Sequence, residues 1–213
     1  MTPGEATAPP PLLAALEQVL HGRRSVRDYR PESVPQALLE AILAAAATAP
    51  SPHHSALWRF VVLTRPAARM ALASAMGAAW HADLQADGVA PDRITAILDR
   101  SHARIAGAPA LVVLCSTDER LDRYPDARRQ AAEQAMAAQS IGAALQNLML
   151  AAHATGLASC WMCAPLFCPA TVVDCLGLDP TLRPQALVTL GYPAAPPPPR
   201  PRSPVADLIA LWH

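Results

Sequence analysis

Apolar residues recur at helical spacing in some stretches of this chain and form short unbroken runs in others. The helical spacing predicts helices over residues 11–20, 35–47 and 169–176, two or three helices between 66 and 105, and a long helix over 125–156. The short apolar runs predict four strands, at residues 58–64, 110–115, 157–162 and 185–192. Helices and strands are therefore mixed along one chain.

Local signals place the ends of several helices. Ser33 is expected to cap the second helix, with Pro35 in its first turn and Gln36 at the capping-box position. Gly88 and Pro91 are expected to divide the helical region that follows the first strand.

The longest predicted helix carries one narrow polar stripe on an otherwise apolar cylinder. Its polar residues recur every seven positions: Glu133, Ser140 and Asn147, and likewise Gln139, Gln146 and His153. Such a helix is expected to be buried on most sides, in the core or at a subunit interface. The polar residues interrupt the apolar stretch and argue against a membrane span.

The end of the chain is rich in proline. Residues 193–213 predict an extended, polyproline-like arm, and its apolar last part, 205–212, is expected to dock against another surface. An arm with an apolar end suggests a partner subunit. No internal repeat or linker divides the chain, so residues 1–213 are expected to form a single domain, with 1–10 flexible.

Composition narrows the classes of function. The 213 residues carry 17 basic and 17 acidic side chains, so no net charge favours nucleic acid or an anionic membrane. Every basic side chain except histidine is arginine, which excludes lysine Schiff bases and P-loop phosphate sites. The N-terminus lacks the pattern of a secretory signal, so a cytoplasmic protein is expected.

An arginine cluster near the N-terminus is the first candidate site. Arg23, Ser25 and Arg27 alternate, so in an extended segment they face one way and suit a phosphate, whereas Arg24 is expected to point elsewhere. The alternative is a solvated basic turn. Two further arginines, Arg200 and Arg202, lie in the proline-rich arm, which could bring them back to the same place.

Two adjacent histidines form the second candidate. His53 and His54 follow a Pro-Ser-Pro turn and precede a strand, where an imidazole can donate a proton or bind a cofactor edge. The alternative is a pair of ordinary exposed loop residues. A metal is not expected, because adjacent histidines in an extended loop diverge and no carboxylate lies in the same turn.

Four cysteines lie close together, at Cys160, Cys163, Cys168 and Cys175. Their uneven spacing does not make a matched zinc site, and the first pair falls in a predicted buried strand, so reduced thiols packed in the core are favoured. The glycine-rich dinucleotide, esterase and zincin motifs are absent from the sequence.

Several motifs together resemble the nitroreductase family. They are Arg23-Arg24-Ser25-Val26-Arg27, Ala49-Pro50-Ser51-Pro52-His53-His54 before Trp58-Arg59-Phe60, Gln146-Asn147, Gly156-Leu157-Ala158-Ser159-Cys160-Trp161, and Gly191-Tyr192-Pro193. Within that family the chain is most similar to the C-terminal flavin domain of the bifunctional ligase that builds coenzyme F-420, a deazaflavin. The closer match adds Trp80-His81-Ala82-Asp83-Leu84, Tyr124-Pro125-Asp126-Ala127-Arg128-Arg129 and Pro193-Ala194-Ala195-Pro196-Pro197.

The resemblance implies an α+β fold around a mostly antiparallel sheet, in a homodimer that exchanges C-terminal arms and binds FMN between its subunits. It implies that the cofactor is held by Arg23, Arg24, Ser25, Arg27, Ser159, Trp161, Met162 and Arg200. It places the acceptor near Ser51 and Asp83. For the proton that follows the hydride, His53, His54 and water are the candidate donors.

The implied activity is hydride transfer from reduced FMN to an unsaturated acceptor, by resemblance dehydro-F-420-0, with a separate ligase as partner because the ligase half is missing. A broad nitro or quinone reductase using NAD(P)H, an oxygen-dependent flavin-fragmenting enzyme and a non-catalytic flavin or deazaflavin carrier are the alternatives. The segment His54-Ser55-Ala56-Leu57-Trp58 departs from the Asn-x-Gln-Pro-Trp of many generic nitroreductases.

Overall fold

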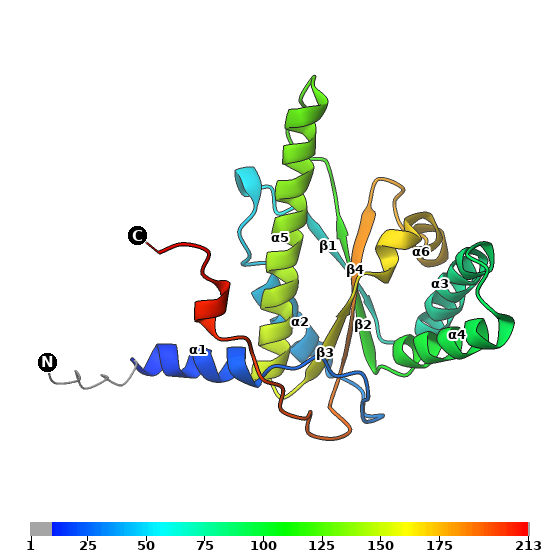
Figure 1. Cartoon of the computed structure of the whole chain (residues 1–213), viewed down its shortest axis with the longest axis horizontal. Coiled ribbons are helices and arrows are strands. Elements are labelled where there is room, and N and C mark those ends of the chain that lie inside the picture. The colour runs from blue at the N-terminus through cyan, green and yellow to red at the C-terminus, as the bar shows by residue number, and fades with distance from the viewer. Residues whose placement is uncertain (1–9, 213) are drawn as a thin grey trace, which may run out of the picture.

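A computed structural model describes residues 10–212, so the predicted flexibility of residues 1–9 lies outside the described part. A central sheet separates two layers of helices (Figure 1). The helices are α1 (Pro11–Gly22), α2 (Gln36–Ala46), α3 (Pro66–Ala86), α4 (Pro91–Ala106), α5 (Ala127–Ala154) and α6 (Pro169–Leu176). The strands are β1 (Trp58–Leu63), β2 (Ala110–Ser116), β3 (Ala158–Met162) and β4 (Arg183–Gly191).

All strand pairs in the sheet are antiparallel. Its order is β1-β2-β4-β3, so β3 and β1 form the two edges. The α+β fold with a mostly antiparallel sheet and flanking helices is therefore confirmed, and each predicted strand is present within a few residues.

The two central strands are apolar because both faces of the sheet are covered. Along β2, Ala110, Val112 and Leu114 pack into the core formed with α2 and α5. The alternate residues of β2 pack on the opposite face with α3 and α6. A strand buried on both faces loses the alternation of polar and apolar residues, and β2 is buried at every position.

The predicted start of α2 is wrong in detail. Pro35, in an extended conformation, occupies the N-cap position, so Ser33 lies before the cap and no side chain caps the helix. The amide of Gln36 donates to Glu40 Oε1 at 2.8 Å instead of completing a capping box. The predicted break between α3 and α4 is confirmed, with Gly88 at a positive φ of 73° and Pro91 in the first turn of α4.

The polar stripe of α5 faces inward at two of its positions. Glu133 and Ser140 are both buried, and the amide of Asn147 donates to the carbonyl of Ala45 in α2 at 3.4 Å. Asp126 caps the helix by accepting the backbone N–H of Arg129 at 3.0 Å. The helix is therefore a core element along its second half, where most positions are buried or half-buried.

Helix α1 and the C-terminal arm lie outside the layered core (Figure 1). None of the residues of α1 is buried, and the arm has no regular secondary structure between residues 196 and 204 before a 3-10 turn at Val205–Leu208. The predicted docking of residues 205–212 is not found within the chain, because all of them are exposed. Among the described helices, none is long and apolar enough to cross a membrane.

Candidate phosphate and acceptor sites

Backbone pairing with an edge strand positions the arginine cluster. Ser25 forms a parallel bridge with Ser159 of β3, and the N–H of Val26 donates to the carbonyl of Ser159 at 3.0 Å. Residues 23–27 therefore run as an extended segment beside β3. This is the conformation that the alternating pattern predicts, and it turns Ser25 and Arg27 to the surface.

The C-terminal arm lies against this segment. A cavity of about 330 Å³ is lined by Arg23, Arg24, Ser25, Arg27, Pro197, Pro198, Arg200, Pro201 and Arg202. Arg202 Nη2 donates to the carbonyl of Arg23 at 3.3 Å, so the arm does return to the cluster. Five arginines line this cavity, and no carboxylate is among its lining residues. We call it the arginine cavity.

The electrostatics of the arginine cavity favour an anion. Burial lowers the pKa of Arg23, and the charges of Arg202 and Arg24 lower it further. Within the described residues, Arg23 Nη1 and Arg24 Nε are buried donors without a hydrogen-bond partner. Buried donors usually have partners, so donors left open beside repelling charges fit a phosphate group.

Arg24 is also among the residues that line the arginine cavity, although its side chain takes a different direction from that of its neighbours. Its Nη1 donates to the carbonyls of His21 and Arg23, and these bonds fold the side chain back over the end of α1. Gly22 allows a close approach here, since a Cβ at this position would lie 2.5 Å from Nε2 of His153. Burial, Arg23 and Arg24 together lower the pKa of His153.

The predicted cofactor residues of β3 have different environments. Ser159 is buried, Met162 is half-buried, and Trp161 is 38% exposed at the sheet edge. All five cysteines are free thiols. Cys160 is buried, as predicted, and burial raises the pKa of its thiol. Cys163 is exposed, in contrast to the prediction, because it lies just after the end of the strand.

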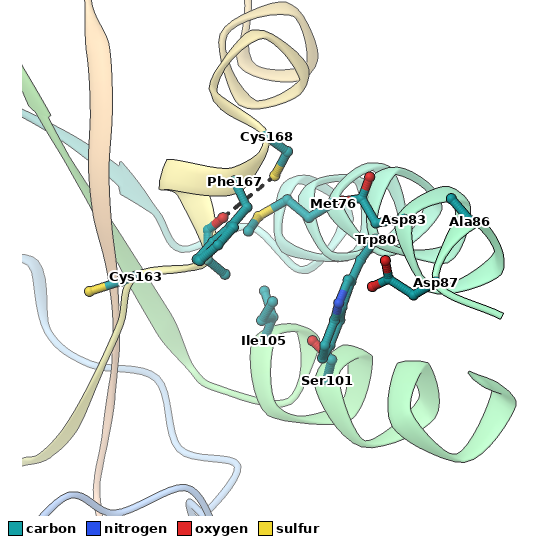
Figure 2. A pocket seen from close by; sticks show the side chains of 11 residues that line it. Met76, Trp80, Asp83, Ala86, Asp87, Ser101, Ile105, Cys163, Phe167 and Cys168 are labelled. Carbon is teal, nitrogen blue, oxygen red and sulfur yellow. Dashed lines mark hydrogen bonds between the residues drawn. The ribbon is translucent and has the colours of Figure 1, made fainter. Parts of the chain in front are cut away.

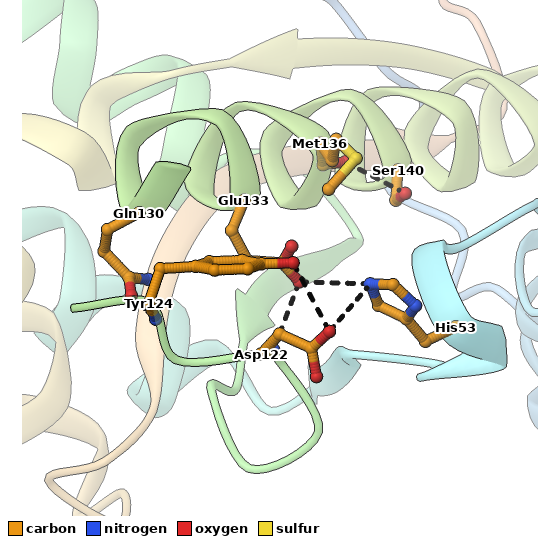
Figure 3. Close-up of polar contacts among 7 residues, drawn as sticks. All are labelled: His53, Asp122, Tyr124, Gln130, Glu133, Met136 and Ser140. Atoms are coloured by element: carbon orange, nitrogen blue, oxygen red, sulfur yellow. Dashed lines mark hydrogen bonds and ion pairs between the residues drawn. The ribbon is translucent and has the colours of Figure 1, made fainter. Parts of the chain in front are cut away.

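The histidine pair lies in a strained turn tied to a buried carboxylate. His53 and His54 have positive φ values of 55° and 51°. His53 Nε2 lies 3.6 Å from Asp122 Oδ2 and 3.6 Å from Glu133 Oε1, as Figure 3 shows. Glu133 Oε1 also accepts the N–H of Asp122 at 3.2 Å, and its Oε2 has no partner in the described part of the chain. The sequence pattern missed this cluster, although it marked Glu133 as part of the α5 stripe.

The two predicted acceptor residues lie apart within one chain. Ser51 Oγ accepts the N–H of Ala56 at 3.0 Å and stabilises the histidine turn. Asp83 lines a separate pocket of about 700 Å³ between α3, α4 and the 3-10 turn Ala164–Phe167 (Figure 2). We call this the α3–α4 pocket. In residues 10–212, no group of three or more metal-ligating side chains is arranged to hold a metal ion.

Curated relatives and solved structures match nearly the whole chain. A protein named NADH dehydrogenase from Thermus thermophilus is 34% identical over 198 residues, covering 90% of this chain and 92% of the relative. The FMN-dependent nitroreductase NfnB from Mycobacterium smegmatis, solved in complex with NADPH, superposes with a TM-score of 0.73 at 24% identity, covering 95% of this chain and all of the other.

A protein from Desulfovibrio desulfuricans described as a nitroreductase, solved in complex with FMN, gives a TM-score of 0.71 at 26% identity and covers 97% of this chain and 99% of the other. Neither the relatives nor the structures link the chain to the F-420 ligase domain in particular. The family model of the nitroreductase family matches residues 20–192. The chain therefore belongs to the nitroreductase family.

Proposed function

We propose that this protein is an FMN-dependent oxidoreductase that passes hydride from a reduced nicotinamide nucleotide to a small unsaturated or aromatic acceptor. The observation that carries the proposal is the arginine cavity, which is lined by five arginines and no carboxylate and has two buried donors without a partner beside it in the described chain. A single terminal phosphate satisfies these donors, and the chain lacks the glycine-rich motif that binds a dinucleotide.

The chain's own residues would bind and orient the cofactor. Arg23, Arg27 and Arg200 would hold the phosphate, with Arg24 and Ser25 beside the ribityl chain. Ser159, Trp161 and Met162 would line the ring from β3. When bound, FMN supplies a carrier that accepts hydride from one substrate and delivers it to another.

A proton must accompany the hydride that reaches the acceptor, and the histidine turn is the proposed source. His53 Nε2 is turned toward Asp122 and Glu133, so this atom already faces two carboxylates of the protein. His54 is exposed and makes no side-chain hydrogen bond in the described part of the chain. His54 is therefore the better placed of the two to release a proton.

Two classes of compound are candidates for the acceptor. A nitro or quinone compound is supported by the relative named NADH dehydrogenase and by the NADPH-bound nitroreductase of the same fold. Dehydro-F-420-0, made by a separate ligase, is the second candidate. Its support is the likeness of the motifs that contain Ser51 and Asp83 to the F-420 ligase domain.

A homodimer with exchanged arms is part of the proposal. Supporting it, Leu12 of α1 is 84% exposed, and Leu208 and Trp212 of the arm are 70% and 82% exposed. Exposed apolar groups on two neighbouring outer segments are typical of a surface that a second protein covers.

One experiment separates these alternatives. The flavin released from the purified protein is identified by chromatography, and the bound flavin is then reduced by NADH without oxygen. A quinone, a nitroaromatic and dehydro-F-420-0 are added in turn, and reoxidation is followed by absorbance. Release of FAD or no flavin contradicts the proposal, and bound FMN that no donor or acceptor turns over indicates a carrier.

A further inference from the structure

The α3–α4 pocket has aromatic and apolar walls. Met76 and Ile105 are 5% and 2% exposed and form its inner side, whereas Trp80 and Phe167 are 42% and 83% exposed and stand at its opening. The indole of Trp80 and the ring of Phe167 flank the space seen in Figure 2. The volume of about 700 Å³ lies in the range of pockets that bury a small planar ligand.

Its charged side chains are both negative. Trp80, Asp83 and Asp87 are three, four and seven positions apart, so they share one face of α3. Both carboxylates lie at the C-terminal end of the helix, where the helix dipole is also negative. Among residues 10–212, neither carboxylate has a basic group within ion-pair distance, and no arginine lines the pocket.

The field of these carboxylates reaches the pocket wall. The thiol of Cys168 lies on the opposite side, and its pKa is raised by burial and then by the charge of Asp83. A cation between aromatic rings and uncompensated carboxylates gains from both the ring faces and the negative potential. An anion of the same shape meets repulsion.

We propose that the α3–α4 pocket binds planar aromatic cations. The biological ligand of this class would be the oxidised nicotinamide ring, which is a pyridinium cation. This part of the inference rests on the proposed function. Strand β3 connects this pocket to the proposed flavin site. Ser159 lies beside the arginine cluster, and Cys163, just after the strand, lines the pocket. The rise of a strand separates them by about 13 Å.

The test uses three probes with one ring system, which are N-methylquinolinium, neutral quinoline and the anion quinaldate. Each is titrated calorimetrically into the purified protein with its flavin bound, at mildly alkaline pH. The cation is expected to bind about tenfold more tightly than the neutral ring, and the anion more weakly than either. Equal affinity for cation and anion, or absence of cation binding, overturns the proposal.

Variants locate the effect. The double variant Asp83→Asn, Asp87→Asn is expected to lose most of the preference for the cation, whereas Asp174→Asn, an exposed carboxylate of α6 outside the pocket, keeps it. Unchanged preference in the double variant overturns the assignment. FMN affinity is measured in the same samples, because a failure of FMN binding in the wild type contradicts the proposed function, whereas loss of charge preference alone contradicts only this inference.

Discussion

Removal of Arg23 should weaken FMN binding without weakening the ligand-free fold. Its Nη1 is a buried donor without a partner in the described chain, so a bound phosphate would supply one charge-assisted bond. Such a bond contributes about 1.5–3 kcal/mol, which corresponds to a loss of affinity of roughly ten- to 150-fold in Arg23→Ala. Titration of FMN into the flavin-free protein, followed by quenching of flavin fluorescence, measures the change.

The same substitution has a second, opposite effect. Because burial, Arg202 and Arg24 lower the pKa of Arg23, its charge is unfavourable in the ligand-free protein, and its removal should leave the thermal midpoint unchanged or raise it. Arg93→Ala, an exposed arginine of α4, is the matched control and should alter neither quantity. Normal FMN affinity in both Arg23→Ala and Arg27→Ala would return the cluster to a solvated basic turn.

Three further predictions follow from the same contacts. Because the pKa of His153 is lowered in the folded protein, the folded state loses stability as the pH falls below the pKa that this histidine has in the unfolded chain. His153→Gln should therefore show a smaller fall in thermal midpoint between about pH 7.5 and about pH 5 than the wild type, and an equal fall in both proteins contradicts this. Deletion of the chain from Pro197 onward should yield monomer or aggregate and release FMN, which light scattering and absorbance would detect; a dimeric, flavin-bound truncation refutes arm exchange. Glu133→Leu should lower the free energy of unfolding in urea by about 0.5–1.5 kcal/mol, because the N–H of Asp122 loses its acceptor, whereas Glu133→Gln keeps an acceptor oxygen and should lose less.

The sheet could be predicted from the sequence because burial leaves a direct mark on it. Both faces of β2 are covered, so every residue from Ala110 to Cys115 is apolar, and a run of this length between helices reads as a buried strand. The arginine cavity could be predicted for a related reason. An extended segment fixes which side chains share a face. The prolines of the arm restrict the backbone conformations of the segment that carries Arg200 and Arg202.

The missed features depend on contacts between distant residues. Ser33 has the chemistry of an N-cap, but Pro35 takes that position and sets the start of α2. The contact of His53 with Asp122 and Glu133 joins residues far apart in sequence, and no local pattern states which carboxylate will reach the histidine turn. The turn that carries His53 contains no carboxylate of its own, and Asp122 and Glu133 reach it only through the fold.

The overall charge says nothing of how the charged side chains are distributed over the surface. A net charge of zero excludes a strong field around the whole molecule, yet β3 runs from the arginine cavity at Ser159 to the acidic α3–α4 pocket at Cys163. The arginines of the arginine cavity and the carboxylates of the α3–α4 pocket thus lie toward opposite ends of β3, and Asp83 and Asp87 form no ion pair in the described chain. Separated charges raise the local potential at each end while cancelling at a distance, so an anionic phosphate and a cationic ring would each be favoured at only one end of the strand.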